Sequence, residues 1–248
     1  MKLRVLGSVS PYAKGKNNCP GYLIDKKETK ILLDCGSGIT RELNLPKDLE
    51  NLTIIISHLH RDHYADLLTI GYASYVYNKL GLLKEKINVY IPEEDSIDKT
   101  YLDKIDEHFL NFITYDEKTR LNINGLSISF RQNPHPVTTY SIKIKNEKNT
   151  LVYSGDTGYK NNVLEEFAKD ADLLICETTF LKSQKGIEDN HLTTHEAGTI
   201  ADKAKVKKLM ITHVWPEIKK IVYLKETKQI FKKTIVAKEG KVLKIGRK

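Results

Sequence analysis

The sequence predicts an α/β fold in which residues 1–248 form a single domain. Short apolar runs recur along the chain, and Gly, Asn, Asp and Pro residues separate them, which is typical of strands joined by turns. Segments with helical periodicity alternate with these runs in the middle of the chain. At 248 residues and 40% hydrophobic composition, the chain can bury a substantial core, and no linker rich in Gly, Ser or Pro divides it.

Strands are expected at the beginning, middle and end of the chain. The opening segment MKLRVLGS has no long apolar stretch or cleavage site, so it predicts a first strand rather than a signal peptide. The continuous apolar run at 53–56 indicates a strand that is buried on both faces. In chain order, strands are predicted at 2–6, 21–24, 30–34, 53–56, 88–91, 126–130, 140–144, 151–154, 173–176, 209–212, 234–237 and 241–245.

Helices are expected between these strands. Apolar residues at helical spacing predict helices at 65–77, 101–111, 163–170, 194–204 and part of 217–233. Either Thr193 or Thr194 is expected to cap the fourth of these helices, with Glu196 supporting its first turn. His195 lies on that first turn, and we interpret it as a structural or solvated residue.

Basic residues are concentrated toward the C-terminal end of the chain. The formal net charge is +8, and from Asp202 onward 15 Lys or Arg residues stand against 4 Asp or Glu residues. This region could bind phosphates or nucleic acid, or it could simply form a lysine-rich solvated face. No RRM, KH or zinc-finger signature accompanies the lysines, so charge alone does not decide between the two.

Cysteine usage and hydropathy indicate a cytoplasmic protein without a membrane partner. No stretch reaches the roughly 18 apolar residues that a membrane helix needs. Cys19, Cys35 and Cys176 are odd in number and scattered, with no CxxC pair. They predict reduced, buried thiols rather than a disulfide framework or a Cys-rich zinc site.

The segment ISHLHRDHYADL, residues 56–67, holds the densest group of potential metal ligands in the sequence. His58, His60, Asp62 and His63 match a metal-ligand spacing that arises by chance on the order of once in two thousand chains of this composition. If the chain stays extended past Ser57, His58 and His60 point the same way, because side chains alternate along a strand. The predicted ligands therefore converge at the carboxyl edge of a strand; the alternative is a polar loop with incidental histidines.

Three further ligand-type residues follow predicted strands. His135 stands between two prolines, which restrict the backbone and can place a ligand rigidly. Asp156 follows the strand of LVYSGDTG, and His213 ends the strand of LMITHVWP. Any one of them alone would more often be structural, but together with the first motif they supply seven candidate ligands.

These residues resemble the metallo-β-lactamase superfamily. Its HxHxDH hallmark is present at residues 58–63, the later ligand positions match in order, and LLDCGSG at 32–38 is similar to the strand end that the family carries before this motif. The resemblance implies a four-layer αββα sandwich with two metals at one sheet edge. It also implies that His58, His60 and His135 hold one metal, that Asp62, His63 and His213 hold the other, and that Asp156 bridges them.

The residue types favour two divalent ions independently of the resemblance. Seven ligands exceed what one tetrahedral ion can use. Two ions a few Å apart produce a bridging hydroxide at neutral pH and stabilise both the attacking and the leaving oxygen. Asp62 could also orient or deprotonate the water. Zinc is the expected metal, and manganese and iron suit the same His and Asp ligands.

Within the superfamily, the chain resembles the phosphodiesterase branch that includes ribonuclease Z. The segments ADLLICETTF at 171–180 and HLTTHEAGTIADKA at 191–204 carry this resemblance. It implies that His191 donates to a phosphoryl oxygen and that Glu177 orients His191. An imidazolium at this point would offset the negative charge that develops during attack. The alternative for His191 is a surface histidine beside a helix.

The spacing of the later ligands argues against a large RNA substrate. Ribonuclease Z inserts a tRNA-gripping arm between the positions that match His135 and Asp156, and these positions are only 21 residues apart here. We therefore expect a hydrolase of a small anionic phosphodiester, such as a cyclic nucleotide or a short oligonucleotide. The alternatives are an armless RNA-processing endonuclease and a non-catalytic binding module with a structural metal. RNA and a second copy of the chain, as a homodimer, are the other partners considered.

Overall fold

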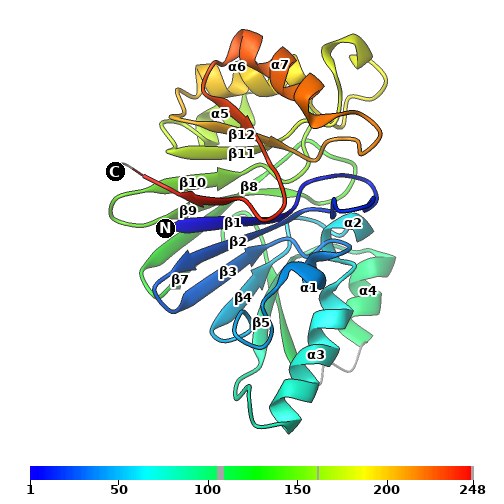
Figure 1. Ribbon diagram of the computed structural model, residues 1–248, viewed down its shortest axis with the longest axis vertical. Coiled ribbons are helices and arrows are strands. Elements are labelled where there is room, and N and C mark those ends of the chain that lie inside the picture. The colour runs from blue at the N-terminus through cyan, green and yellow to red at the C-terminus, as the bar shows by residue number, and fades with distance from the viewer. Residues whose placement is uncertain (105–108, 161, 247–248) are drawn as a thin grey trace.

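The computed structural model describes residues 1–104, 109–160 and 162–246, and two seven-stranded sheets lie at its centre with helices outside them (Figure 1). Helices α5, α6 and α7 lie beyond one sheet, whereas α1 to α4 lie beyond the other. The order helix, sheet, sheet, helix is that of the αββα sandwich that the family resemblance implies.

The first sheet is built mainly from the N-terminal half of the chain. Its strand order is β14 (Val242–Lys244), β1 (Lys2–Gly7), β2 (Gly21–Lys26), β3 (Thr29–Leu33), β4 (Leu52–Ile55), β5 (Ile87–Pro92) and β6 (Leu110–Tyr115). Pairing is antiparallel from β14 to β3 and parallel from β3 to β6. The last strand of the chain thus pairs with the first, with Leu3 opposite Leu243.

The second sheet is built from the later part of the chain, and here too antiparallel strands precede parallel ones along the sequence. Its order is β13 (Thr234–Val236), β12 (Leu209–Thr212), β11 (Leu173–Glu177), β10 (Thr150–Tyr153), β9 (Tyr140–Lys145), β8 (Leu126–Gln132) and β7 (Arg120–Ile123). Strands β10 to β13 are parallel, and β7 to β10 are antiparallel. Parallel strands in each sheet align their carboxyl ends along one edge, which is where ligand-type residues can gather.

Three apolar cores hold the layers together. One lies between the sheets and joins residues such as Ile24 and Ile142, one from each sheet. The outer helices are α1 (Ile39–Glu42), α2 (Arg61–Tyr64), α3 (Leu67–Lys79), α4 (Ile97–Lys104), α5 (Val163–Phe167), α6 (Thr194–Lys203) and α7 (Lys220–Ile230), with a 3-10 turn at Lys182–Gln184. The second core packs the first sheet against helical residues such as Ile70, and the third packs the second sheet against residues such as Ile200.

Most predicted elements agree with the structure, and one does not. Every predicted strand overlaps an observed one, but β6 and β7 were not predicted, and the predicted helix at 101–111 is wrong in its final part. Residues 97–104 are helical, 105–108 lie outside the described residues, and Leu110 begins a strand. Leu110 pairs with Ile87 in parallel register, so sheet pairing overrides the helical periodicity there.

The predictions for the cysteines, for membrane helices and for the cap of α6 also agree with the structure. Cys19, Cys35 and Cys176 are free and buried, as predicted. Among the described residues, no helix combines the length and apolar character that crossing a membrane requires. Thr193 caps α6 in a capping box with Glu196, and His195 is exposed on the first turn.

Candidate metal centre

The ligand-type residues follow the carboxyl ends of strands in both sheets. His58 and His60 lie just after β4, and Asp62 and His63 lie on the short helix α2. His135, Asp156 and His213 follow β8, β10 and β12 respectively, so the second sheet supplies the rest. The structure therefore brings together residues from 58 to 213 at one edge of the sandwich.

Four of these residues form the first ligand group. His58, His60, His135 and Asp156 each offer a ligand atom, and these atoms lie within 4.8 Å of one another. The nitrogen His58 Nε2 lies 3.1 Å from His60 Nδ1, which lies 3.3 Å from His135 Nε2. His58 is fully buried, while His60 and His135 are partly exposed, so one side of this group opens to solvent.

A second ligand group contains Asp62, His63 and His213, again with ligand atoms within 4.8 Å. His63 Nε2 lies 3.2 Å from His213 Nε2, and Asp62 Oδ2 lies 3.5 and 3.6 Å from these two nitrogens. His63 and His213 are buried. Ser10 Oγ donates to Asp62 Oδ2 at 2.9 Å, which fixes the carboxylate against this pair.

Asp156 lies between the two groups. Its Oδ2 is 3.6 Å from His58 Nε2 and 3.2 Å from His213 Nε2, and its Oδ1 is 3.4 Å from His63 Nε2. The buried Oδ1 makes no hydrogen bond with any described residue. A buried carboxylate oxygen without a donor is costly, and a cation between the groups would satisfy it.

Hydrogen bonds behind the rings orient four of the histidines for metal binding. His63 Nδ1 donates to Asp34 Oδ2 at 2.7 Å, and His135 Nδ1 donates to the carbonyl of Asn190 at 3.1 Å. The single hydroxyl proton of Ser57 goes to Asp34, so Ser57 Oγ accepts from His58 Nδ1 at 3.0 Å. In each case Nδ1 is the hydrogen-bond donor and Nε2 faces the ligand group, which is the orientation that a metal-binding histidine adopts.

Thr179 orients the fourth histidine and links it to the predicted catalytic pair. Thr179 Oγ1 donates to Glu177 Oε2 at 3.0 Å and accepts from His213 Nδ1 at 2.9 Å. Glu177 Oε1 in turn accepts from His191 Nδ1 at 2.9 Å. His191, Asp156 and His213 also offer ligand atoms within 4.8 Å of one another. His191 is thus beside the centre, and Glu177 is the side chain that holds it.

Asp34 is the residue that sequence reasoning left without a role. It is fully buried, and its carboxylate accepts from Ser57 N at 2.6 Å, Ser57 Oγ at 2.9 Å and Tyr153 OH at 2.6 Å in addition to His63. The only sequence signal for it was its place in the segment at 32–38 that resembles a family strand end. Asp34 therefore holds His63 of the second group directly and His58 of the first group through Ser57.

The electrostatics of the two groups differ. Burial lowers the pKa of His58, His60 and His135, so these rings are neutral and their lone pairs are available. Burial also opposes protonation of His213, but the charge of Asp156 outweighs it and raises the pKa of His213 to about 10. This half of the centre carries a negative field that attracts cations.

Neighbouring charges shift the pKa of Asp62, in the second group, and of His191, beside it. Burial would raise the pKa of Asp62, but His63 and His213 outweigh it and lower that pKa to about 2. Burial lowers the pKa of His191, but the charge of Glu177 and the hydrogen bond to it outweigh burial, so the net shift is upward.

Two residues just after strand ends, Gly155 and His213, have left-handed backbone conformations with positive φ. Gly155 precedes Asp156 at φ 58°, and a Cβ there would lie 2.9 Å from the carbonyl of Tyr140. His213 adopts φ 57°, a conformation that a non-glycine residue rarely takes. Such strain persists where the surroundings fix the residue, and it is common at functional sites.

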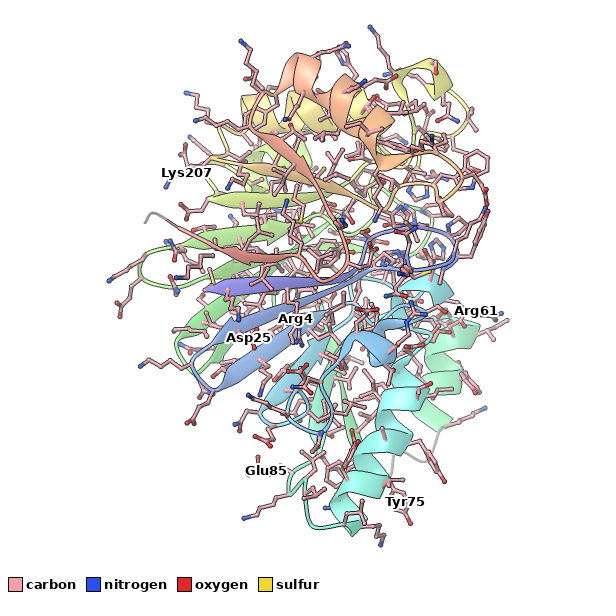
Figure 2. All side chains as sticks on the ribbon, viewed as in Figure 1. Arg4, Asp25, Arg61, Tyr75, Glu85 and Lys207 are labelled. Atoms are coloured by element: carbon pink, nitrogen blue, oxygen red, sulfur yellow. The ribbon has the colours of Figure 1, made fainter. Side chains whose placement is uncertain are left out.

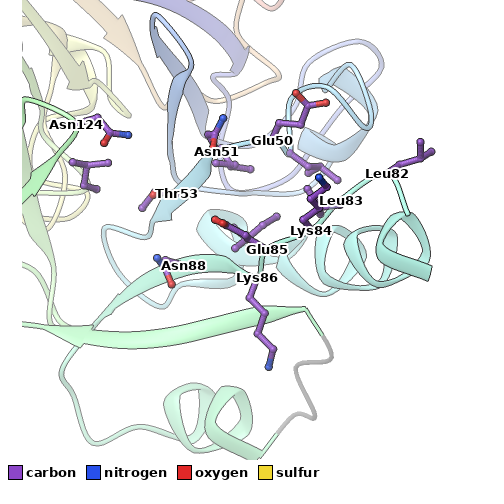
Figure 3. A pocket seen from close by; sticks show the side chains of 14 residues that line it. Glu50, Asn51, Thr53, Leu82, Leu83, Lys84, Glu85, Lys86, Asn88 and Asn124 are labelled. Atoms are coloured by element: carbon purple, nitrogen blue, oxygen red, sulfur yellow. The ribbon is translucent and has the colours of Figure 1, made fainter. Parts of the chain in front are cut away.

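A separate cavity lies at the opposite edge of the first sheet (Figure 3). It measures about 500 Å³ and is lined at the amino ends of β4 and β5 by residues 49–53 and 82–88, with Ile123 and Asn124. None of the predicted site residues lines it. The candidate metal centre is therefore not this cavity but the strand-end cluster.

Comparison with known proteins agrees with this architecture. A family model described as "Beta-lactamase superfamily domain" matches residues 29–214. A probable metallo-hydrolase, YhfI of Bacillus subtilis, is 32% identical over 215 residues, which cover 86% of this chain and 87% of that protein. The crystal structure of YhfI superposes with a TM-score of 0.88 at 29% identity, covering 98% of this chain and 99% of the other.

Two more distant relatives are similar over nearly the whole chain. Ribonuclease Z of Archaeoglobus fulgidus is 25% identical over 305 aligned positions, covering 98% of this chain and 97% of that protein. A diphosphatase from the PhnP family has a TM-score of 0.77 at 16% identity, covering 98% and 97% of the two chains, which shows a shared fold alone.

Proposed function

The chain belongs to the beta-lactamase superfamily and is a metal-dependent hydrolase, and from this premise we propose that it is a dinuclear phosphodiesterase. Its proposed substrate is a small anionic phosphodiester, such as a cyclic nucleotide or a short oligonucleotide. The observation that carries the proposal is the pair formed by His191 and Glu177, joined at 2.9 Å beside Asp156 and His213.

The two ligand groups have the donors that a pair of divalent cations needs. His58, His60 and His135 would hold one cation, Asp62, His63 and His213 the other, and Asp156 would contact both. Zinc suits these His and carboxylate ligands best, and manganese and iron remain alternatives. When bound, two such cations lower the pKa of a water molecule so that it can attack at neutral pH, and they offset charge on the phosphoryl oxygens.

His191 would act on the substrate rather than on the metals. Its Nδ1 is held by Glu177, so its Nε2 can donate a hydrogen bond to a phosphoryl oxygen or to the leaving oxygen. Glu177 is buried and also accepts from the backbone of Thr157 and Thr179, so it holds the ring in one orientation. A fixed donor aimed at developing negative charge is a large contributor to phosphoryl transfer.

The chain between the third ligand and Asp156 favours a small substrate. It contains only β9, a turn and β10, with no extension that could grip a folded RNA. The alignment with ribonuclease Z covers 305 positions, more than the 248 residues of this chain, so the relative has segments that this chain lacks.

An armless RNA-processing endonuclease is the second candidate. The similarity to ribonuclease Z over 98% of the chain favours it, as does the basic region after Asp202. This candidate predicts that structured RNA binds and that its affinity falls steeply as salt rises. A small-substrate enzyme would not need that binding.

Hydrolysis of bis(p-nitrophenyl) phosphate by the purified protein tests the proposal. We expect turnover that a chelator abolishes and added Zn²⁺ restores. His191→Ala should lose roughly 100-fold or more in turnover, whereas His195→Ala, at an exposed position on α6, serves as the matched control. A panel of cyclic nucleotides, dinucleotides and precursor tRNA then separates the two candidates. Unchanged turnover after metal removal would rule out both.

A further inference from the structure

Two exposed aromatic side chains follow closely on residues of the candidate metal centre. Trp215 comes two residues after the candidate ligand His213, and it is 42% exposed. Tyr12 is 44% exposed and comes two residues after Ser10, whose hydroxyl donates to Asp62 Oδ2 at 2.9 Å. A two-residue step spans at most roughly 7 Å of backbone. Both rings therefore belong to chain segments that start at the second ligand group.

Hydrogen bonds join these two segments on either side of Trp215. Just before it, the carbonyl of Val214 accepts from Ser10 N at 3.2 Å. Two residues beyond it, Glu217 Oε1 accepts from Tyr12 OH at 2.8 Å. The two aromatic residues therefore lie on neighbouring segments that are tied together before and after Trp215.

The same edge of the sandwich carries the proposed phosphoryl donor. Figure 1 shows the loop between β1 and β2 and the chain after β12 at the end of the strands where α2 lies, and Figure 2 labels Arg61 of α2 there. The ring of His191 stacks on that of His213, with 5.4 Å between their centroids. A phosphodiester held at the ligand groups and His191 would therefore have the aromatic segments beside it.

The surroundings hold the two aromatic residues in place and leave their ring faces free. Tyr223 OH accepts from Trp215 N at 3.3 Å and donates to the carbonyl of Thr179 at 3.1 Å. Among the described residues, the indole N–H of Trp215 has no hydrogen-bond partner, and neither its ring nor that of Tyr12 stacks on another ring. Both ring faces and the indole donor are therefore available to a ligand.

The charge beside the rings does not oppose an anionic ligand. Glu217 Oε1 accepts from Tyr12 OH, and Glu217 Oε2 accepts from Lys14 Nζ, so both oxygens of this carboxylate are compensated. Aromatic side chains bind nucleobases by stacking, with little preference among bases, because every base has a π-face. A flat base attached to a phosphate suits both the rings and the centre beside them.

We propose that Tyr12 and Trp215 form a stacking site for the nucleobase of the substrate, an inference that rests on the proposed phosphodiesterase function. The substrate is then a nucleotidyl phosphodiester. Its phosphate lies at the candidate metal centre, and its ribose spans the short step to the two rings. A phosphodiester without a base would reach the same centre but leave both rings exposed. The two aromatic residues therefore favour nucleotides over other phosphodiesters.

Tryptophan fluorescence tests the site without turnover, because Trp215 is the only tryptophan in the chain. Adenosine 5′-monophosphate should quench the emission of the metal-loaded protein, since a stacked base quenches an indole. Ribose 5-phosphate, which carries a phosphate but no base, should not. Tyr12→Ala should weaken the binding of the nucleotide about tenfold, and Tyr12→Phe, which keeps the ring, should recover most of it. Tyr72→Ala removes an exposed ring from α3 and is the matched control.

A pair of substrates separates the stacking site from the hydrolase activity. The p-nitrophenyl ester of thymidine 5′-phosphate carries a base, methyl p-nitrophenyl phosphate does not, and both release the same leaving group. Trp215→Ala should raise the KM of the thymidine ester about tenfold relative to that of the methyl ester, because only the thymidine ester loses a stacking partner. Trp215→Phe should recover most of this loss.

The stacking site and the proposed function can fail separately. Emission that neither compound quenches, or that both quench alike, would overturn the stacking site, and so would equal changes of the two KM values in Trp215→Ala. If the wild-type protein hydrolyses neither ester, the proposed function is wrong, whereas base-dependent quenching would still establish a nucleotide-binding site at Trp215.

Discussion

The two ligand groups of the candidate metal centre are built from similar residues but supported differently. In the first group, His135 is held by a backbone carbonyl, and two of the three histidines are partly open to solvent. In the second group, His63 and His213 are buried, and side chains hold both of them: Asp34 holds His63, and Thr179 holds His213. The first group therefore depends on a backbone carbonyl behind His135 as well as on the Ser57 hydroxyl behind His58, whereas side chains hold both histidines of the second group.

We therefore expect the candidate centre to be most sensitive to mutation at the buried side chains behind the second group. A backbone carbonyl survives most substitutions, whereas a buried carboxylate or hydroxyl does not. The network behind the second group also reaches His191 through Glu177, so the same bonds that orient a ligand orient the proposed phosphoryl donor. Changes in this network should affect metal binding and turnover together.

Asp156→Asn should have the largest effect, because Asp156 lies between both groups. The amide keeps the size but loses the charge, so we expect turnover to fall by roughly a thousandfold and both metal sites to weaken. Elemental analysis after dialysis, alongside turnover of bis(p-nitrophenyl) phosphate, measures both. Retention of two metals per chain with normal turnover would show that Asp156 does not couple the groups.

Asp34→Asn should weaken the second group more than the first. An amide has one acceptor oxygen for four donors, so His63 loses its anchor, and we expect roughly 10–100-fold weaker binding at the second site. A zinc titration against a chromophoric chelator resolves the two binding steps. Equal weakening of both steps would contradict the proposed difference between the groups.

Thr179→Val should have a smaller effect of the same kind. Valine keeps the shape but removes the hydroxyl between His213 and Glu177, so we expect about tenfold weaker metal binding at the second site and a matching loss of turnover. Thr179→Ser restores the hydroxyl and should recover most of both. If serine and valine behave alike, the hydroxyl is not what positions His213.

Asn190→Ala should change almost nothing. His135 is held by the carbonyl of Asn190 and not by its side chain, so metal content and turnover should stay within about twofold of the wild type. The same assays measure this, and the variant is the counterpart of Thr179→Val in the first group. A tenfold loss here would mean that the side chain of Asn190, and not only its carbonyl, positions His135.

The sequence predicted which ligand-type residues gather better than it predicted the residues that hold them in place. The spacing of His58, His60, Asp62 and His63 and the strand ends before Asp156 and His213 are local patterns, and the structure brings these residues together. Thr179 was not anticipated, because its partner His213 is 34 residues away and only folding makes them neighbours. Strand β6 was missed for a similar reason, since its pairing with β5 depends on contacts between distant segments.

The pairing of β14 with β1 has a consequence for how the protein is assembled during synthesis. Every member of the first ligand group has been synthesised once residue 156 has been added, whereas His213 follows 57 residues later. The strand at 242–244 arrives later still, so β1 keeps an unpaired edge throughout most of translation. The sheet edge at β1 is therefore closed only when one of the last segments of the described chain has been synthesised.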